Sequence, residues 1–195
     1  MMKKILMMTC ILALISTTGF AGTDFVLNLS PGFILYSPDA EGFKVSDGWK
    51  TEETEGYISN TAILGAGVGF ETPDLFFDMT GGVGYLWSSS VKAKLVMMDF
   101  ACRFKLHRDE MTLGPHLSIM KYKPDWGGDT DISLGDDTAV SGGLSFTIGS
   151  KPFSIMAALD YISLSFDVES PGIAIDGGSL DLSGIALQIG LLFRF

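Results

Sequence analysis

Cysteine is almost absent from this sequence, which has only Cys10 and Cys102 in 195 residues. Cys10 falls inside an N-terminal segment that we expect to be removed. The remaining chain then has a single cysteine, which excludes an internal disulfide even in an oxidising compartment. Cys102 is interpreted as a small apolar residue. Long apolar runs are absent too: after the first segment, no stretch approaches eighteen consecutive apolar residues, so no transmembrane helix is predicted.

Basic residues are scarce as well. The sequence has 13 Lys and Arg against 23 Asp and Glu, a formal net charge of −10. A nucleic-acid partner demands a basic surface, so we expect none. Yet 47% of the residues are hydrophobic. Such a content without a spanning helix is hard to reconcile with a soluble protein, whereas half of each strand in a membrane β-barrel faces lipid.

The first residues predict export from the cytoplasm. Lys3 and Lys4 precede an apolar run at 5–16, and Gly19 and Ala21 occupy positions −3 and −1 of an expected cleavage site. The run is too short to span a bilayer, so a cleaved signal peptide is favoured over an anchor helix. The predicted organisation is a signal peptide at 1–21 and one barrel domain at 22–195.

The rest of the chain alternates between apolar residues and small or polar ones, which is typical of strands with two different faces. Eight such segments are expected, near 24–36, 57–70, 75–87, 93–106, 111–122, 139–148, 153–168 and 181–195. The predicted fold class is all-β, an eight-stranded antiparallel up-and-down transmembrane β-barrel. Ser30-Pro31-Gly32 interrupts the first segment and predicts a bulge.

The connections between strands alternate in length. Short ones at 71–74, 107–110 and 149–152 are built from turn-favouring or polar residues. Longer ones lie between them, at 37–56, 123–138 and 169–180, together with a shorter one at 88–92. In outer-membrane barrels the short turns are periplasmic and the long loops extracellular, so both chain ends are expected on the periplasmic side.

The predicted outer loops are acidic, since 37–56 and 123–138 each carry a net charge of −4. The second of them has four aspartates that form a weak candidate site for a divalent cation: Asp129, Asp131, Asp136 and Asp137. An EF-hand would need Gly and Glu where Leu134 and Val140 stand. A solvated acidic loop is therefore favoured, and neither a metal nor a cofactor is predicted.

Aromatic residues gather at the strand ends, as in the girdles of membrane barrels. On the loop side these are Tyr36, Tyr57, Trp87 and Tyr122; on the turn side they are Phe70, Phe77, Phe104, Phe153, Phe193 and Phe195. A soluble lipocalin-like barrel is the competing fold, but it would have its apolar face inside. Here glycines occupy the polar face and the aromatics the apolar one, which favours lipid outside.

The last strand carries a family resemblance. Residues 185–195 alternate regularly and end on Phe193 and Phe195, which is similar to the C-terminal signal read by the barrel-assembly machinery. With the pattern of the whole mature chain, this resembles the small OmpA/OmpX-type outer-membrane barrels of Gram-negative bacteria, without a peptidoglycan-binding domain. The resemblance implies an outer-membrane location and two kinds of partner, which are outer-membrane lipid with lipopolysaccharide and the barrel-assembly machinery. It also implies a monomer.

Strand parity directs one polar set into the lumen: Asp78, Asp99, Arg103, Lys105, His116, Asp160, Gln188 and Arg194. An eight-stranded barrel is only wide enough to be filled by its own side chains, and opposite charges there should pair. If the hairpin across 88–92 is centred between Ser90 and Val91, residues whose numbers sum to 181 face each other, and Asp78 lies opposite Arg103. Across the short turn at 107–110, residues whose numbers sum to 217 are expected to face each other. Asp99 then lies opposite Ser118 and diagonal to His116.

Three functions follow from this arrangement. The favoured one is a structural or surface-interaction role through the acidic loops, with the lumen set as a plug. A narrow or gated pore is the alternative. The third rests on His116 and Ser118, whose spacing resembles the His-x-Ser of outer-membrane lipid A deacylases. Parity directs both side chains into the lumen and no Glu follows at a suitable distance, so an enzyme is not predicted.

Overall fold

The computed structural model describes residues 22–36, 43–46, 51–54, 58–88, 91–107, 110–127, 133–169, 174–176 and 179–195. The predicted signal peptide at 1–21 lies outside these ranges, as do parts of the long loops. Among the described residues, no helix has the length and apolarity needed to cross a membrane.

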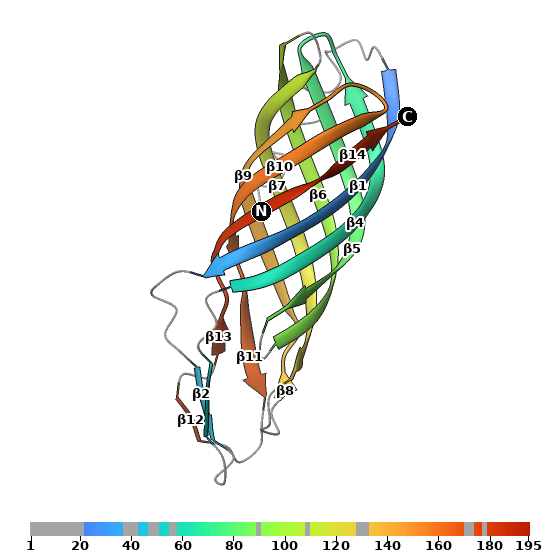
Figure 1. Cartoon of the computed structure of the whole chain (residues 1–195). Helices are drawn as coiled ribbons and strands as arrows, with labels where there is room; N and C mark the ends of the chain where they lie inside the picture. Colours follow the sequence, from blue (N-terminus) through green and yellow to red (C-terminus); the bar gives the residue numbers. More distant parts are fainter. Residues whose placement is uncertain are drawn as a thin grey trace, which may run out of the picture.

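Eight long strands form a closed antiparallel barrel in the order β1-β14-β10-β9-β7-β6-β5-β4 (Figure 1). Their bounds are β1 (Gly22–Tyr36), β4 (Ile58–Glu71), β5 (Leu75–Trp87), β6 (Val91–His107), β7 (Met111–Trp126), β9 (Asp137–Ile148), β10 (Phe153–Ser163) and β14 (Gly184–Arg194). Each strand pairs with its neighbour along the chain, and β1 closes the barrel on β14. The predicted eight-stranded up-and-down barrel is confirmed.

Short strands extend beyond one end of the barrel, which we call the loop side (Figure 1). One three-stranded sheet consists of β2 (Phe43–Ser46), β3 (Thr51–Thr54) and β12 (Ala174–Asp176); another consists of β8 (Ser133–Leu134), β11 (Ser165–Glu169) and β13 (Ser179–Asp181). The opposite end, with the short connections and the C-terminal end of β14, is the turn side. The sequence predicted connections where five of these short strands lie. β2 pairs locally with β3, but β12 and β8 pair with strands of other loops, which no local alternation encodes.

The bulge predicted at Ser30-Pro31-Gly32 is wrong. The pairing of β1 with β14 keeps one register from Leu29 opposite Leu191 to Gly32 opposite Gln188, and the pairing with β4 has no shift either. Ser30 and Pro31 have no partners on β14. Proline lacks the backbone donor, which interrupts the ladder on one side without adding a residue. The register shift lies in β6 instead, between Lys105 and His107.

The polarity of the wall is the reverse of that of a soluble protein. Large apolar side chains cover the outer surface, among them Phe25, Leu64, Val83, Val96, Leu117, Leu144, Leu159 and Ile189. Polar side chains are buried inside, among them Asn28, Ser30, Thr80, Ser118, Ser141, Thr147 and Ser154. An apolar outside around a polar inside is the arrangement of a barrel that crosses a membrane, so the lipocalin-like alternative is wrong.

Candidate functional site

The lumen is the candidate site, and its turn-side half holds the charged side chains. Arg103 on β6 forms an ion pair through Nη1 with the Asp78 carboxylate on β5, and neither side chain is more than 2% exposed. The Arg103 Nε donates to Ser145 Oγ on β9 at 2.8 Å, and Nη2 lies 3.8 Å from Met156 Sδ on β10. One guanidinium thus links four strands across the barrel.

The predicted register between β5 and β6 is wrong by two residues. Asp78 lies opposite Ala101, so facing numbers sum to 179 and not to 181. The cause is the tight turn, where Ser88 N donates to Val91 O at 2.8 Å and Val91 N donates to Ser88 Oγ at 3.1 Å. Arg103 still contacts Asp78 because its long side chain reaches the diagonal position.

His116 on β7 lies between two carboxylates. Its Nδ1 is 2.9 Å from Asp160 Oδ2, and its Nε2 is 2.5 Å from Asp99 Oδ1. Ser118 Oγ donates to the same Asp99 oxygen at 2.6 Å. The predicted register of β6 with β7 is confirmed, since Asp99 lies opposite Ser118. A carboxylate only accepts hydrogen bonds, so a ring that donates to both is an imidazolium cation.

This arrangement differs from a nucleophile and its general base. Such a pair needs a direct hydrogen bond between the hydroxyl and a ring nitrogen. Here both nitrogens of His116 face carboxylates, and the hydroxyl of Ser118 donates to Asp99. The two residues therefore belong to the ionic network of the lumen and do not contact each other as the enzyme hypothesis requires.

A second ionic cluster lies at the turn-side mouth. Lys105 Nζ is 2.6 Å from Glu71 Oε1, and Lys151 Nζ is 2.6 Å from Glu71 Oε2 and 2.7 Å from Asp24 Oδ2. Burial lowers the pKa of Lys151, but the hydrogen bonds and charges of Asp24 and Glu71 outweigh it and raise that pKa above its ordinary value. The sequence placed Lys105 in the lumen set but did not single out Glu71, its partner, or Lys151 and Asp24, the other members of the cluster.

Two further members of the predicted set lie near the β1–β14 seam. Arg194 places its guanidinium carbon 4.8 Å from the centre of the Phe76 ring, and its Nη2 donates to Ser154 Oγ at 3.3 Å. Gln188 is buried opposite Gly32. A Cβ at Gly32 would meet Gln188 Cγ at 2.9 Å, so the glycine makes room for this side chain. The structure thus buries Arg194 and Gln188, and the described contacts of these two side chains do not include His116, Asp99 or Asp160.

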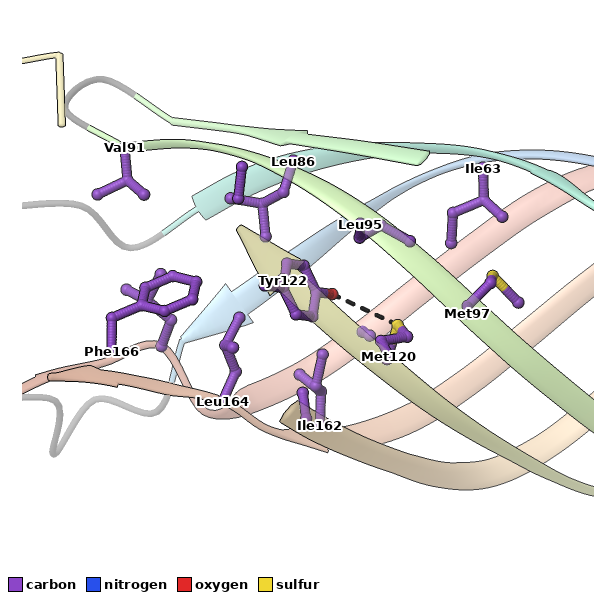
Figure 2. Packing of buried hydrophobic residues seen from close by; sticks show 14 of the residues in the cluster. Ile63, Leu86, Val91, Leu95, Met97, Met120, Tyr122, Ile162, Leu164 and Phe166 are labelled. Carbon is purple, nitrogen blue, oxygen red and sulfur yellow. Dashed lines mark hydrogen bonds between the residues drawn. The ribbon is translucent and has the colours of Figure 1, made fainter. Parts of the chain in front are cut away.

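The loop-side half of the lumen is filled by apolar side chains, several of which Figure 2 shows meeting from different strands. The cluster is Ile63, Leu86, Val91, Ala93, Leu95, Met97, Met120, Tyr122, Ala139, Ile162, Leu164, Phe166, Leu180, Leu182 and Ala186. The ring of Tyr122 meets that of Phe166 edge-on, with centroids 6.1 Å apart, and its hydroxyl donates to Met120 Sδ at 3.4 Å.

Sequence reasoning missed this apolar half. Its signal was available, because the inward parity of the strands becomes apolar toward the loop side, as at Leu95 and Met97 on β6. Tyr122 was assigned to the outer aromatic girdle, which is wrong, since its side chain is 1% exposed. It shares the even, inward parity of His116 and Ser118 on β7.

The four aspartates of the weak divalent candidate are not brought together as a described site. Asp129 and Asp131 lie outside the described residues. Asp136 Oδ2 is 3.7 Å from Lys121 Nζ, and the two carboxylate oxygens of Asp137 accept from the backbone of Thr138 and Ser165. In the part of the chain that the structure describes, no group of three potential metal-ligating side chains occurs.

The outer aromatics mark both ends of the apolar band. On the loop side, Tyr85 and Trp87 stack with centroids 6.1 Å apart. On the turn side, Phe193 stacks on Phe195 at 6.4 Å and contacts Phe153. The side chains of Tyr36 and Tyr57 lie outside the described residues. Eight closed strands, a lumen filled by ion pairs and apolar side chains, and an apolar outer band stand together. This is the architecture of the small outer-membrane barrels of the OmpA/OmpX type.

No protein-family model and no curated protein matches the sequence. Among solved structures, Neisserial surface protein A is similar with a TM-score of 0.49 and 14% identity, over 89% of this chain and 99% of that one. Outer-membrane protein AlkL is similar with a TM-score of 0.48 and 11% identity, over 92% and 93%. Ail of Yersinia pestis has a TM-score of 0.39 and 14% identity, over 87% and 98%.

Proposed function

We propose that the protein is an integral outer-membrane barrel with a closed lumen that acts through the structures on its loop side. The observation that carries the proposal is the double filling of the interior. Charged side chains joined by ion pairs, together with the small apolar cluster of Val26, Phe76, Met156 and Leu192, fill the turn-side half. The larger apolar cluster fills the loop-side half. A solute would have to separate buried ion pairs and then displace the apolar cluster, which is costly at both levels.

The same observation weighs against the alternatives. A pore needs a continuous polar path, and the apolar cluster interrupts it. A lipid A-modifying enzyme needs its reactive groups at the lipid-facing surface, whereas His116 and Ser118 are buried in the lumen. A structural or surface-interaction role needs neither, and the two loop-side sheets provide ordered surfaces for it. The acidic loops would then face outward and both chain ends the periplasm.

Conductance tests the closed lumen directly. We expect the purified chain to give no stable channels in planar bilayers, because both fillings are intrinsic to the barrel. Large, stable, water-filled openings would refute the plug and favour the pore. The measurement needs a parallel check of heat-modifiable gel mobility, so that an unfolded preparation is not mistaken for a closed barrel.

Complementation tests the role of the loops without a known ligand. A variant with residues 43–54 replaced by a short Gly-Ser linker keeps all eight barrel strands. We expect it to accumulate as a folded barrel and yet to behave like the deletion strain in every phenotype that the deletion shows. Full rescue by this variant would show that the barrel alone carries the function.

A further inference from the structure

Four lysines gather on the outer surface of the β6–β7 hairpin at its loop-side end. Lys92 and Lys94 on β6 and Lys121 and Lys123 on β7 are all exposed and have outward parity. The register places Lys94 directly opposite Lys123, with Lys92 and Lys121 one outward position to either side. The whole sequence has only 13 Lys and Arg. Four of them therefore meet on one small area of an acidic protein.

Within the part of the chain that the structure describes, the quartet is only partly neutralised. Directly opposed like charges destabilise an antiparallel pair, and Lys94 and Lys123 are such a pair. Among the described residues the only ion pair of the quartet joins Lys121 to Asp136, at 3.7 Å between highly exposed side chains. Asp125 lies opposite Lys92 on the same face and supplies one further negative charge. A net positive patch remains, and it calls for an external anion.

Neighbouring residues place the patch at the membrane boundary. Across β5, Trp87 lies opposite Lys92 and Tyr85 opposite Lys94, and these stacked rings are typical of the headgroup level. The next outward positions toward the turn side, Val96 and Ile119, are exposed apolar residues of the lipid-facing band. The amino groups therefore lie where the headgroups of the loop-side leaflet begin.

The turn side carries no matching patch among the described residues. Its outward positions there are apolar, as at Phe104, Leu106 and Phe153. Its described cations, Lys105, Lys151 and Arg194, are engaged at the mouth or inside the lumen. As far as the described residues go, the basic patch thus lies at one leaflet, which favours a recognition of that leaflet over a general attraction to membranes.

We propose that Lys92, Lys94, Lys121 and Lys123 bind the phosphate groups of a phosphorylated lipid in the loop-side leaflet. Lysine ammonium groups neutralise phosphate as point charges, and long lysine side chains reach from the wall to the headgroup level. Four lysines around two opposed positions can neutralise more than one phosphate, which favours a bisphosphorylated glycolipid such as lipid A. That identification rests on the proposed outward orientation of the loop side.

Binding is measured by titrating bisphosphorylated lipid A into the full chain in zwitterionic micelles, with native mass spectrometry as readout. We expect K94Q/K123Q to weaken the affinity about 30-fold, from roughly fivefold for each lysine near an anionic surface. The charge-matched control K44Q/K50Q, in the first long loop, should bind as the wild type does. D125N should bind more tightly, since it removes a carboxylate from the patch.

Equal binding by K94Q/K123Q and the control would overturn the site. Equal binding of dephosphorylated lipid A would overturn the phosphate assignment. Competition by inorganic phosphate at the same concentration would reveal a free-anion site and overturn the lipid assignment. These outcomes leave the conductance and complementation tests untouched, so a failure here is separable from a failure of the proposed function.

The direction in which K94Q shifts the urea midpoint of unfolding gives an independent test. In zwitterionic lipid K94Q removes a repulsion and should raise the urea midpoint of unfolding. In membranes containing bisphosphorylated lipid A the same substitution removes a bound partner and should lower that midpoint relative to the wild type. The inversion supports the proposal, whereas a change of the same sign in both membranes contradicts it.

Discussion

A charged side chain buried inside the barrel destabilises the fold unless an opposite charge pairs with it. Asp78 and Arg103 are both buried, and Arg103 also donates to Ser145. Removing one member of a buried pair leaves an uncompensated charge and costs about 3–5 kcal/mol, whereas removing both leaves none. The energy of the pair is therefore visible mainly as non-additivity.

We predict that Asp78→Ala and Arg103→Ala each lower the free energy of unfolding by about 3–5 kcal/mol and that the double variant loses clearly less than the sum. Urea unfolding of the folded barrel in one defined lipid measures all three. Ser145→Ala is the control for the second partner of Arg103 and should cost less, about 1.5–3 kcal/mol for a hydrogen bond to a charged group. Strict additivity would show that the two charges do not interact.

His116 provides the second residue-level prediction. His116→Ala leaves Asp99 and Asp160 facing each other's charge without a cation, and should cost about 3–5 kcal/mol of unfolding free energy. His116→Gln can still donate one hydrogen bond and should cost less. Ser118→Ala removes one donor to the Asp99 carboxylate and should cost about 1.5–3 kcal/mol. Equal stability of His116→Ala and the wild type would refute the bridging role.

At the scale of elements, the alternation of residues predicted the eight barrel strands and the inward face of each. It did so because one face of every strand contacts lipid and the other does not, so side-chain polarity is set locally. Register was harder. The β6–β7 register followed from the centre of its turn, but the β5–β6 register depends on hydrogen bonds of Ser88 that composition does not reveal.

The long-range pairings of the short loop-side strands could not be predicted from the sequence. β2 pairs with β12 from the far end of the chain, and β8 pairs with β11. Such pairings depend on which loops the closed barrel brings together, so no local pattern encodes them. The apolar half of the lumen was predictable in principle, because its residues share the inward parity of the charged ones. It was missed because only polar inward residues were considered.

The turn at 149–152 gives the element-level prediction. Gly149 has φ +126°, a conformation that favours glycine, and the turn presents Lys151 to Asp24 on β1 and Glu71 on β4. The pKa of Lys151 is raised above its ordinary 10.5. Its contribution to stability is therefore fully present below that value and is lost as the pH rises through the higher pKa of the folded state.

We expect the wild type to be more stable than Lys151→Gln below about pH 10 and the difference to shrink as the pH rises beyond the unfolded pKa. Urea midpoints at a series of alkaline pH values measure it. Because the lysine is partly exposed, the difference should be small. Lys44→Gln, in the first long loop, is the control and should not reproduce this pH dependence. A constant difference across the range would mean that Lys151 stabilises the mouth by packing alone.

At the scale of the whole molecule, the two ends of the barrel differ in construction. The turn side ends in short connections and an ionic cluster, whereas the loop side continues into two sheets beyond the wall (Figure 1). A basic patch on the outer wall also marks the loop side. If the barrel lies in the outer membrane as proposed, this asymmetry defines which end faces the medium.

Protease added to intact cells tests that orientation. We expect cleavage within 37–56 or 123–138, because these segments contain the short strands β2, β3 and β8 beyond the barrel. We expect no cleavage at 71–74, 107–110 or 149–152. The short turns become accessible only after the outer membrane is opened, so permeabilised cells serve as the control for their susceptibility. Cleavage of the short turns in sealed cells would reverse the topology, and the lysine patch would then face the inner leaflet.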